Sequence, residues 1–210
     1  MRLILHSGLG AIGYLGENAS AQTGREDRLD IQTFPIEGLV ALTPKTFGDH
    51  RGYFMESYNK RAFAEAGIDC EFIQDNQSSS LKGTLRGLHF QINVEQAKLL
   101  RVLHGKIYDV AVDIRPDSPT YGQWQSIMLS AENRRQFFVP RGFAHGFQVV
   151  SDTAVVLYKV DNFWSPENER GLLWSDPQLG IDWPDMDQPI LSDKDKVHPL
   201  LNDLNTSLVP

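Results

Sequence analysis

The feature that most constrains this fold is a series of short runs rich in β-branched and aromatic residues, separated by turn signals. Such spacing is typical of antiparallel β-proteins. One segment, Asn59 to Gly67, favours a short helix, with Phe63 on its apolar side and Gly67 as its C-terminal stop. Serial strands with so little helix predict a mainly β fold, a barrel or a jelly roll. The strand-length runs are Leu99 to Leu103, Ile107 to Ile114, Trp124 to Leu129, Gln136 to Val139, Gly146 to Val150 and Ala154 to Val160.

The length and composition fit one globular domain. The chain has 210 residues, 41% of them hydrophobic, which is enough to bury a core without disulfides. Residues 1–30 mix glycine, polar and charged residues without a sustained period, so we expect a poorly ordered N-terminal extension there. The domain is expected over residues 31–196, and a C-terminal tail over 197–210. A faint likeness of residues 1–21 to an export signal is outweighed by the glycines that interrupt its apolar part.

The charge and the cysteine content exclude several classes of protein. A formal net charge of -7 argues against nucleic-acid binding, which needs clustered lysines and arginines. The total charge does not exclude a local basic pocket that binds a small phosphate. Cys70 is the single cysteine, so neither an intrachain disulfide nor a multi-cysteine metal site is expected. No apolar stretch approaches the roughly 18 residues that cross a membrane. We therefore expect a cytoplasmic protein, in keeping with a reducing compartment.

The segment Thr84 to Gln91 places a lone histidine in a strand-like apolar run. Because strand side chains alternate between faces, His89 should lie on one face and its neighbours Arg86 and Leu88 on the other. A half-buried imidazole near Lys98 or an arginine is biased toward its neutral form, which can accept a proton. His89 is therefore a candidate general base, and the alternative is a core histidine with its hydrogen bonds satisfied.

Three further residues are candidates for ligand contact. His145 lies in a glycine-bounded turn entering a strand, where it contacts a ligand or bonds the local backbone. Tyr158 ends an apolar run before Lys159, so its phenol could point inward beside a cation and donate a proton, or could simply pack. Trp164 is either core filler or a flat platform for a nucleobase.

A metal site is not expected. Barrels can hold a transition metal with histidines and a carboxylate, and the usual motif places two histidines one residue apart on a strand. The residue two beyond His89 is Gln91, and no His-x-His occurs in the chain. Two polar clusters, Gln74 to Asn76 and Ser192 to Lys196, resemble a loop cap and a solvated surface stretch when judged by composition alone.

Taken together and in order, the motifs resemble those of the dTDP-4-dehydrorhamnose 3,5-epimerase family. So many ordered matches at near-family spacing are more specific than any single motif. The resemblance implies a cupin-like jelly roll, also called a double-stranded β-helix, with a few short helices. The matching segments are Phe47 to Ser57, Gln74 to Asn76, Gly83 to Gln91, Lys98 to Val102, Asp109 to Arg115, Leu129 to Gln136, Gly142 to Phe147 and Leu191 to Lys196.

The resemblance also implies an isomerase that inverts C3 and C5 of dTDP-4-dehydro-6-deoxy-D-glucose to give dTDP-4-dehydro-L-rhamnose, a rhamnose precursor. A ketone at C4 acidifies the protons on both neighbouring carbons, so a base and an acid can invert each centre without a redox cofactor. The family's base falls on His89 and the aspartate that orients it on Asp195. Its proton donor falls on Tyr158, and the cation that stabilises the enolate falls on Lys98. No cofactor and no metal are expected.

The family's contacts to nucleotide and diphosphate can be carried over to matching positions. The family is a homodimer whose N-terminal strands cross over, so Arg51, Phe54 and Glu56 are expected to reach the neighbouring subunit's site. Trp164 stands where the family usually has a tyrosine, and the link from His89 to Lys98 is one residue shorter than usual. The carried-over substrate contacts are Arg51, Phe54, Glu56, Gln74, Asp75, Asn76, Arg86, His145, Trp164, Glu169 and Lys194.

Two alternatives remain at this point. A relative that inverts only C3 or only C5 of a dTDP-4-keto-deoxysugar could use the same base and acid. A non-catalytic barrel that binds a sugar nucleotide would need neither. The presence of His89, Lys98, Tyr158 and Asp195 together favours an enzyme over a binding protein, because binding alone does not require a matched acid and base.

Overall fold

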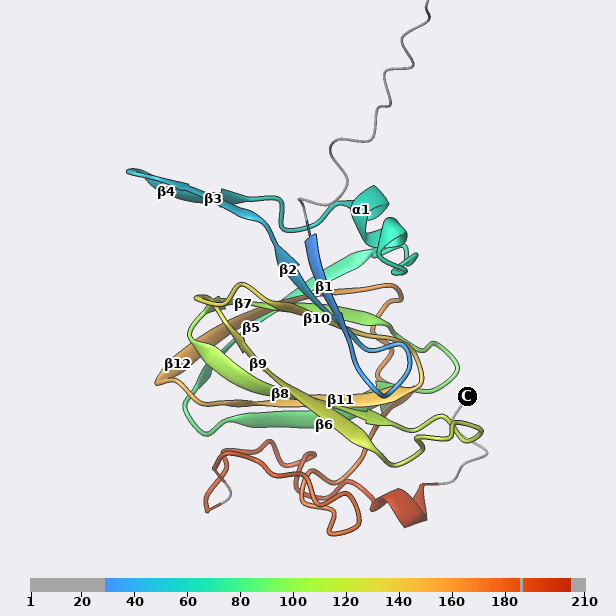
Figure 1. The fold of residues 1–210 in the computed structure, drawn as a ribbon. Helices are drawn as coiled ribbons and strands as arrows, with labels where there is room; N and C mark the ends of the chain where they lie inside the picture. Colours follow the sequence, from blue (N-terminus) through green and yellow to red (C-terminus); the bar gives the residue numbers. More distant parts are fainter. Residues whose placement is uncertain (1–28, 186, 205–210) are drawn as a thin grey trace, which may run out of the picture.

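The computed structural model describes residues 29–185 and 187–204 (Figure 1). Strand β1 (Leu29–Thr33) begins two residues before the expected start of the domain. Most of the expected N-terminal extension, including its faint likeness to an export signal, lies outside the described residues. No described helix is long and apolar enough to cross a lipid bilayer.

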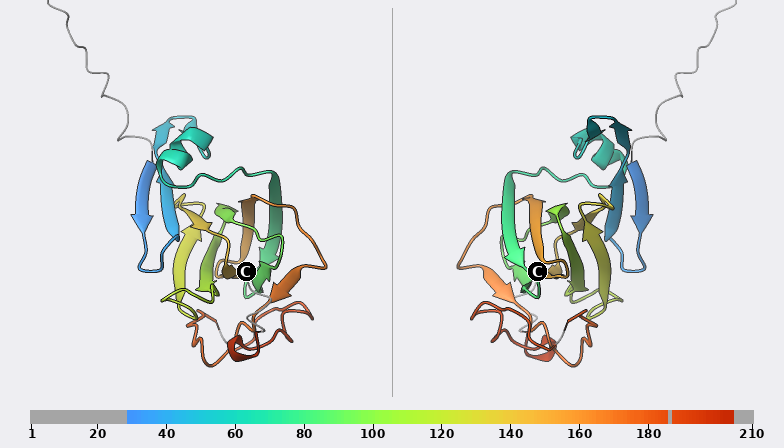
Figure 2. Two further views of the ribbon diagram at one scale, coloured as in Figure 1. Left: turned by 90° about the vertical axis from the view of Figure 1, so that its right-hand side faces the viewer. Right: turned by 90° about the vertical axis from the view of Figure 1, so that its left-hand side faces the viewer.

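Two antiparallel sheets face each other and make the mainly β jelly roll that the sequence predicted (Figures 1 and 2). In the six-stranded sheet the order is β1, β2 (Val40–Pro44), β10 (Gln136–Val139), β7 (Lys98–His104), β12 (Thr153–Val160) and β5 (Gln74–Leu81). In the five-stranded sheet the order is β13 (Glu169–Gly171), β6 (Leu85–Gln91), β11 (Phe143–Val149), β8 (Lys106–Asp113) and β9 (Trp124–Ser130). The six strand-length runs of the sequence correspond to β7 to β12.

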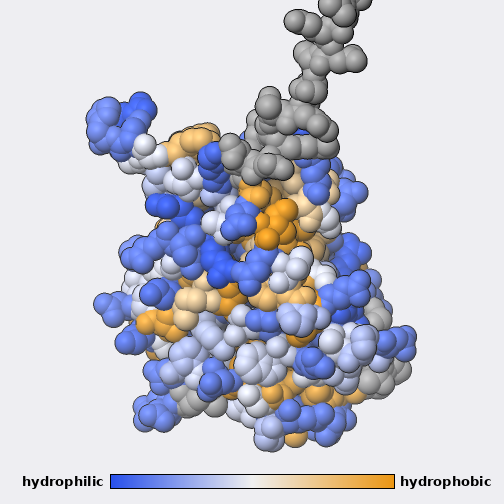
Figure 3. All heavy atoms as spheres, in the orientation of Figure 1, coloured by the Kyte–Doolittle hydropathy of each residue, from blue (hydrophilic) through white to orange (hydrophobic). Residues whose placement is uncertain are grey.

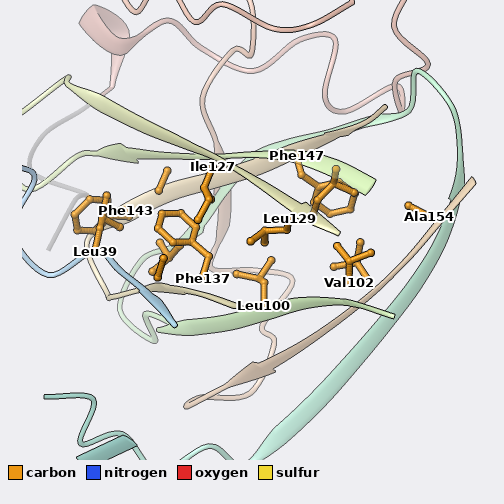
Figure 4. Close-up of a cluster of buried hydrophobic side chains, with 14 of the residues drawn as sticks. Leu39, Leu100, Val102, Ile127, Leu129, Phe137, Phe143, Phe147 and Ala154 are labelled. Carbon is orange, nitrogen blue, oxygen red and sulfur yellow. The ribbon is translucent and has the colours of Figure 1, made fainter. Parts of the chain in front are cut away.

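The main hydrophobic core fills the space between the sheets (Figure 4). Leu100 of β7 and Phe137 of β10 pack here together with Ile127, Leu129 and Phe147 from the five-stranded sheet. Each such buried side chain stabilises the fold by roughly 1.5–3 kcal/mol relative to exposure. This core holds the sheets at a fixed separation, and the functional site described below is built on that frame.

Each sheet is also covered over part of its outer face. Helix α1 (Lys60–Glu65) packs Phe63 against Leu42, Leu99 and Phe138, so every residue of β10 is buried. The helix lies within the predicted segment, and the Asn59 side chain caps it by accepting from two backbone N–H groups. These outer contacts explain why the apolar residues of β10, Phe137 to Val139, follow one another instead of alternating with polar residues.

The C-terminal segment covers the five-stranded sheet. Trp183 and Leu201 are buried in a cluster with Leu88, Val110 and Leu172. Apart from a short 3-10 helix, η1 (Leu201–Asp203), the segment is irregular. The expected end of the domain at residue 196 falls inside this packed segment, which continues to residue 204.

A two-stranded arm, β3 (Thr46–Asp49) and β4 (Gly52–Met55), projects from the body (Figure 1). Its aromatic side chains are exposed, with Phe54 at 70%. The face shown in Figure 3 has a hydrophobic patch over β1 and β2, where Ile31 is also exposed. An arm with exposed aromatics beside an apolar patch is a surface of the kind that contacts another protein.

Candidate active site

A cavity of about 350 Å³ lies between the two sheets and is closed on one side by the C-terminal segment. Leu100 and Phe147 belong both to its lining and to the main core, so the cavity continues the core. Seven of the predicted site residues line it: Arg86, His89, Lys98, His145, Tyr158, Lys194 and Asp195. The other lining residues are Ser78, Leu100, Phe147 and Ser192.

His89 and Asp195 form a hydrogen-bonded pair in this cavity. His89 Nε2 lies 2.6 Å from Asp195 Oδ1, and the Asp195 side chain is 4% exposed. Burial would raise the pKa of Asp195, but the adjacent His198 imidazole and the hydrogen bond from His89 hold it well below its usual range. Asp195 is therefore an anion that can only accept, so His89 donates from Nε2 and keeps a lone pair on Nδ1. The imidazole thus has the tautomer and the support of a general base.

The environment of His89 keeps its imidazole neutral. Burial lowers its pKa, and the nearby Lys98 cation lowers it further, against the opposing effect of Asp195. The side chain keeps 26% exposure, so it remains open to the cavity. The lowered pKa of His89 agrees with the predicted bias toward the neutral, proton-accepting form of the imidazole.

Arg86 lies in the same cavity as His89, and the prediction that the two face opposite sides of the sheet is wrong. On β11, His145 lies opposite His89 and Phe147 lies opposite Arg86, so β6 carries one extra residue. This bulge reverses the alternation between the two positions. It depends on glycine, because Gly87 has a φ of 126° and a Cβ there would lie 2.6 Å from Gly146 Cα.

Lys98 places a half-buried cation beside the base. Its Nζ donates to the carbonyl oxygen of His89 at 3.3 Å. Burial lowers the pKa of Lys98 to about 8, and the Asp109 and Glu169 carboxylates limit that fall. Because this value lies above neutrality, Lys98 is mostly protonated at pH 7 and can stabilise a developing negative charge.

His145 forms a second histidine–carboxylate pair. It lies within β11 rather than in the turn before it, and its Nε2 is 2.9 Å from the fully buried Asp109 Oδ1. The pair sits next to Lys98 in the cavity wall. The alternative of a turn histidine that bonds only local backbone is therefore wrong.

Tyr158 enters the cavity from the six-stranded sheet, opposite the sheet that carries His89. Burial raises the pKa of Tyr158, while the Arg86 charge opposes the rise. The phenol stays protonated at neutral pH and can donate. The cation beside it is not the neighbouring Lys159, which lies on the other face of β12 and pairs with Asp75 at 2.9 Å.

The polar segment before Ser78 is a strand rather than a loop cap. In β5, Asn76 lies opposite Tyr158 and is bonded to Gln74 at 2.8 Å, so both amides lie on the cavity side of the sheet. Asp75 faces the other way. The two amides extend the polar wall that Ser78 begins.

Glu169 and Trp164 lie at the margin of the cavity. Glu169 pairs with Lys194 at 2.7 Å, and this cation outweighs the effect of burial, so that the pKa of Glu169 is lowered. Trp164 is 56% exposed and lies beside Glu169, so it is not core filler. Its ring is free to serve as a stacking surface.

Arg51, Phe54 and Glu56 do not join this cavity within one chain. All three are exposed on or just after the projecting arm, and Arg51 bonds with Asp49.

The sequence analysis did not identify His198, whose Nε2 lies 3.4 Å from Asp195 Oδ1. The signal in the sequence that could have identified His198 is its position three residues after Asp195.

Metal-ligand atoms gather at one place in the described part of the chain. His89, Asp195 and His198 each offer one atom, and these atoms lie within 4.8 Å of one another. The short hydrogen bond between His89 and Asp195 already engages two of the three. The arrangement therefore supports His89 as a base that Asp195 orients.

Comparison with known proteins gives a consistent result. The sequence profile of a family described as dTDP-4-dehydrorhamnose 3,5-epimerase matches residues 33–203. A Pseudomonas aeruginosa enzyme of that name is 55% identical over 162 residues, which cover 77% of this chain and 90% of the relative.

Solved structures agree. A Legionella pneumophila dTDP-6-deoxy-D-glucose-3,5-epimerase in complex with dTDP-4-keto-L-rhamnose superposes with a TM-score of 0.85 at 48% identity, covering 87% of this chain and 98% of that one. A 3'-monoepimerase from Streptomyces bikiniensis in complex with dTDP-quinovose superposes with a TM-score of 0.77 at 34% identity, covering 81% and 87%. The chain therefore belongs to the dTDP-4-dehydrorhamnose 3,5-epimerase family.

Proposed function

We propose that this protein inverts C3 and C5 of dTDP-4-dehydro-6-deoxy-D-glucose, giving dTDP-4-dehydro-L-rhamnose. The observation that carries the proposal is one cavity to which opposite sheets contribute a neutral, carboxylate-supported histidine and a protonated tyrosine. A base and an acid on opposite walls are what inversion at carbon requires, since the proton must leave one face of the sugar and return to the other.

The reaction begins with proton abstraction by His89. The C4 ketone acidifies the protons on C3 and on C5, so one base can serve both carbons in turn. Asp195 holds the ring and stabilises the imidazolium that forms when Nδ1 takes the proton. Negative charge moves onto the C4 oxygen, where the protonated Lys98 stabilises the enolate.

Tyr158 completes each inversion by donating a proton to the opposite face. Before the next inversion His89 releases its proton to solvent and Tyr158 takes one up from solvent. Its raised pKa keeps the phenol protonated, and the Arg86 charge near it stabilises the phenolate that donation leaves behind. The sugar ends at the oxidation level at which it began, so this chemistry requires no redox cofactor.

The cations at the cavity support binding of the nucleoside diphosphate. Arg86 and Lys194 line the cavity in a chain of net charge -7, and a pocket's field depends on nearby charges rather than on the total. The amides of Gln74 and Asn76 can bond the base, and Trp164 offers it a flat ring. Glu169 would orient Lys194 through their ion pair.

A homodimer with exchanged N-terminal strands would complete the site. The projecting arm carries Arg51, Phe54 and Glu56 away from the cavity of its own chain, and the neighbouring β1 is an edge strand beside an apolar patch. An edge strand can pair with another chain, and a two-fold dimer would bring each arm to its partner. We place this dimer in the cytoplasm, where the free thiol of Cys70 would persist.

A single-centre epimerase is the second candidate, because a 3'-monoepimerase shares this fold at 34% identity. Incubating the purified protein with dTDP-4-keto-6-deoxyglucose and a reductase that traps the product separates the candidates. NMR of the trapped product should show the L-rhamno configuration at both C3 and C5. Inversion at one centre alone would support the second candidate, and no turnover would reject both.

A further inference from the structure

A second histidine lies against the carboxylate that supports His89. His198 Nε2 is 3.4 Å from Asp195 Oδ1, the same oxygen that His89 Nε2 approaches to 2.6 Å. The two imidazole rings meet edge to face, with centroids 5.7 Å apart and planes at 81°. One carboxylate oxygen therefore lies between two imidazoles, of which the reaction above uses one.

The His198 nitrogen is buried and is short of partners. Nε2 has no well-formed hydrogen bond within the described residues, and Asp195 is the acidic group with which it pairs. A buried N–H group is normally satisfied, because its lost hydration is otherwise uncompensated. Contacts in an empty site are often long and tighten when substrate binds, so 3.4 Å is consistent with a bond that shortens during the reaction.

The chain is built to hold His198 in this place. A Cβ on Gly171 of β13 would lie 2.2 Å from two atoms of the His198 ring, so glycine at that position leaves room for the ring. The backbone on either side is tied down. Leu173 N–H donates to Pro199 O at 2.8 Å, and Leu201 N–H donates to the buried Asp176 Oδ2 at 2.6 Å.

We propose that His198 is a positioning residue that donates from Nε2 to Asp195 and so sets the orientation and basicity of the catalytic pair. The proposal rests on the function inferred above and extends it to a residue that acts through Asp195. The neutral Nε2–H tautomer and the imidazolium both have a proton to donate. By sharing the carboxylate oxygen, His198 weakens it as an acceptor for His89 and keeps Asp195 from rotating.

The direction of the effect on His89 follows from the shared oxygen. A carboxylate with one donor removed stabilises the His89 imidazolium more strongly, so loss of the His198 donor raises the pKa of His89. The other titratable and charged groups around the pair stay in place in a His198 variant. They are Arg86 on β6, Lys98 on β7, His145 on β11, Tyr158 on β12, Glu169 on β13, and Lys194 and the buried Asp176 in the C-terminal segment.

The test compares His198→Phe, which keeps an aromatic ring without the donor, with His198→Gln, which returns an amide N–H near the position of Nε2. The His89 ring proton is titrated by NMR in the free enzyme, and kcat and KM are measured across pH. For His198→Phe we expect the His89 titration and the acidic limb of kcat/KM to move to higher pH. We also expect kcat to fall about tenfold, with KM nearly unchanged, because His198 does not line the cavity.

His198→Gln should restore most of the wild-type titration and rate, which a merely space-filling role would not require. His104→Phe, an exposed histidine at the end of β7, serves as the matched control and should change neither. Gly171→Ala leaves His198 in the chain but fills its place, and should move the His89 titration in the same direction as His198→Phe.

The outcomes separate this inference from the proposed function. An unchanged His89 titration and rate in a folded His198→Phe protein overturns the role of His198, even if the enzyme is an epimerase. If the wild-type protein shows no epimerase activity, the proposed function is wrong. The NMR titration of His89 in the His198 variants then still tests the role of His198. Should His198→Phe not fold, long-range proton–nitrogen NMR of wild type decides, since an unprotonated His198 Nε2 contradicts the proposal.

Discussion

His89 Nε2 lies 2.6 Å from Asp195 Oδ1, although the two residues are 106 positions apart in the chain. His89 comes from a strand of the five-stranded sheet, and Asp195 comes from the irregular segment that packs beside it. The base and its support therefore meet only when the whole domain has folded.

Replacing the base should abolish turnover without abolishing binding. His89→Ala removes the proton acceptor, and we expect kcat to fall about 10²–10⁴-fold, the usual contribution of a general base. Calorimetric titration with dTDP should give nearly the wild-type affinity, because the cationic side chains of the cavity remain. His104→Ala is the control and should keep full activity. A His89→Ala enzyme with near-normal turnover would reject the assigned base.

Replacing the acid should impair the return of the proton. Tyr158→Phe keeps the ring and removes the hydroxyl, so we expect slow formation of inverted product while exchange of the substrate's own protons with solvent continues. The stereochemistry of the product is read by NMR, with Tyr121→Phe as a control outside the cavity. Inversion of both centres at the wild-type rate would show that Tyr158 is not the donor.

The rate should depend on pH with limbs set by His89 and Lys98. The base acts when neutral, so kcat/KM rises with pH through the pKa of His89, which burial and Lys98 lower. The cation acts when protonated, so kcat/KM falls as pH rises through about 8, the pKa of Lys98. In Lys98→Arg the basic limb should move to higher pH, because guanidinium stays charged. A basic limb that stays near pH 8 in that variant would contradict this role.

Each active site should need the arm of the partner subunit. Arg51→Ala and His89→Ala homodimers should both have little activity, but mixed dimers regain one complete site if Arg51 acts across the interface. Random assortment makes half of the dimers mixed, so co-expression should restore about a quarter of wild-type activity. If Arg51 served its own chain, every site in the mixture would lack one residue and no activity would return.

Much of the fold could be predicted because the strands carry local signals. The apolar runs and glycine turns predicted β7 to β12, and Asn59 and Gly67 marked the ends of the helical segment. Strand β5 could not be recognised, because one of its faces meets a polar cavity and the other meets solvent. Its residues Gln74 to Ser80 therefore show no hydrophobic alternation.

The site was predicted less completely, for physical reasons. Residues of the cavity wall could be named from motifs. The face of the sheet on which each side chain lies could not be predicted, because it depends on how the strands pair. Arg86 joined His89 through a bulge that no local propensity indicates, since it arises where Gly87 meets Gly146. His198 was missed because its role depends on the room left by Gly171, which lies far earlier in the chain.

Deuterium uptake from heavy water tests the central claim most directly, namely that one base and one acid on opposite walls exchange protons next to the C4 ketone. Wild-type enzyme should place solvent deuterium at both C3 and C5 of the product, as read by NMR. His89→Ala should lose uptake at both carbons. Product formed in heavy water without deuterium at C3 and C5, or full uptake at both carbons by His89→Ala, would contradict the account.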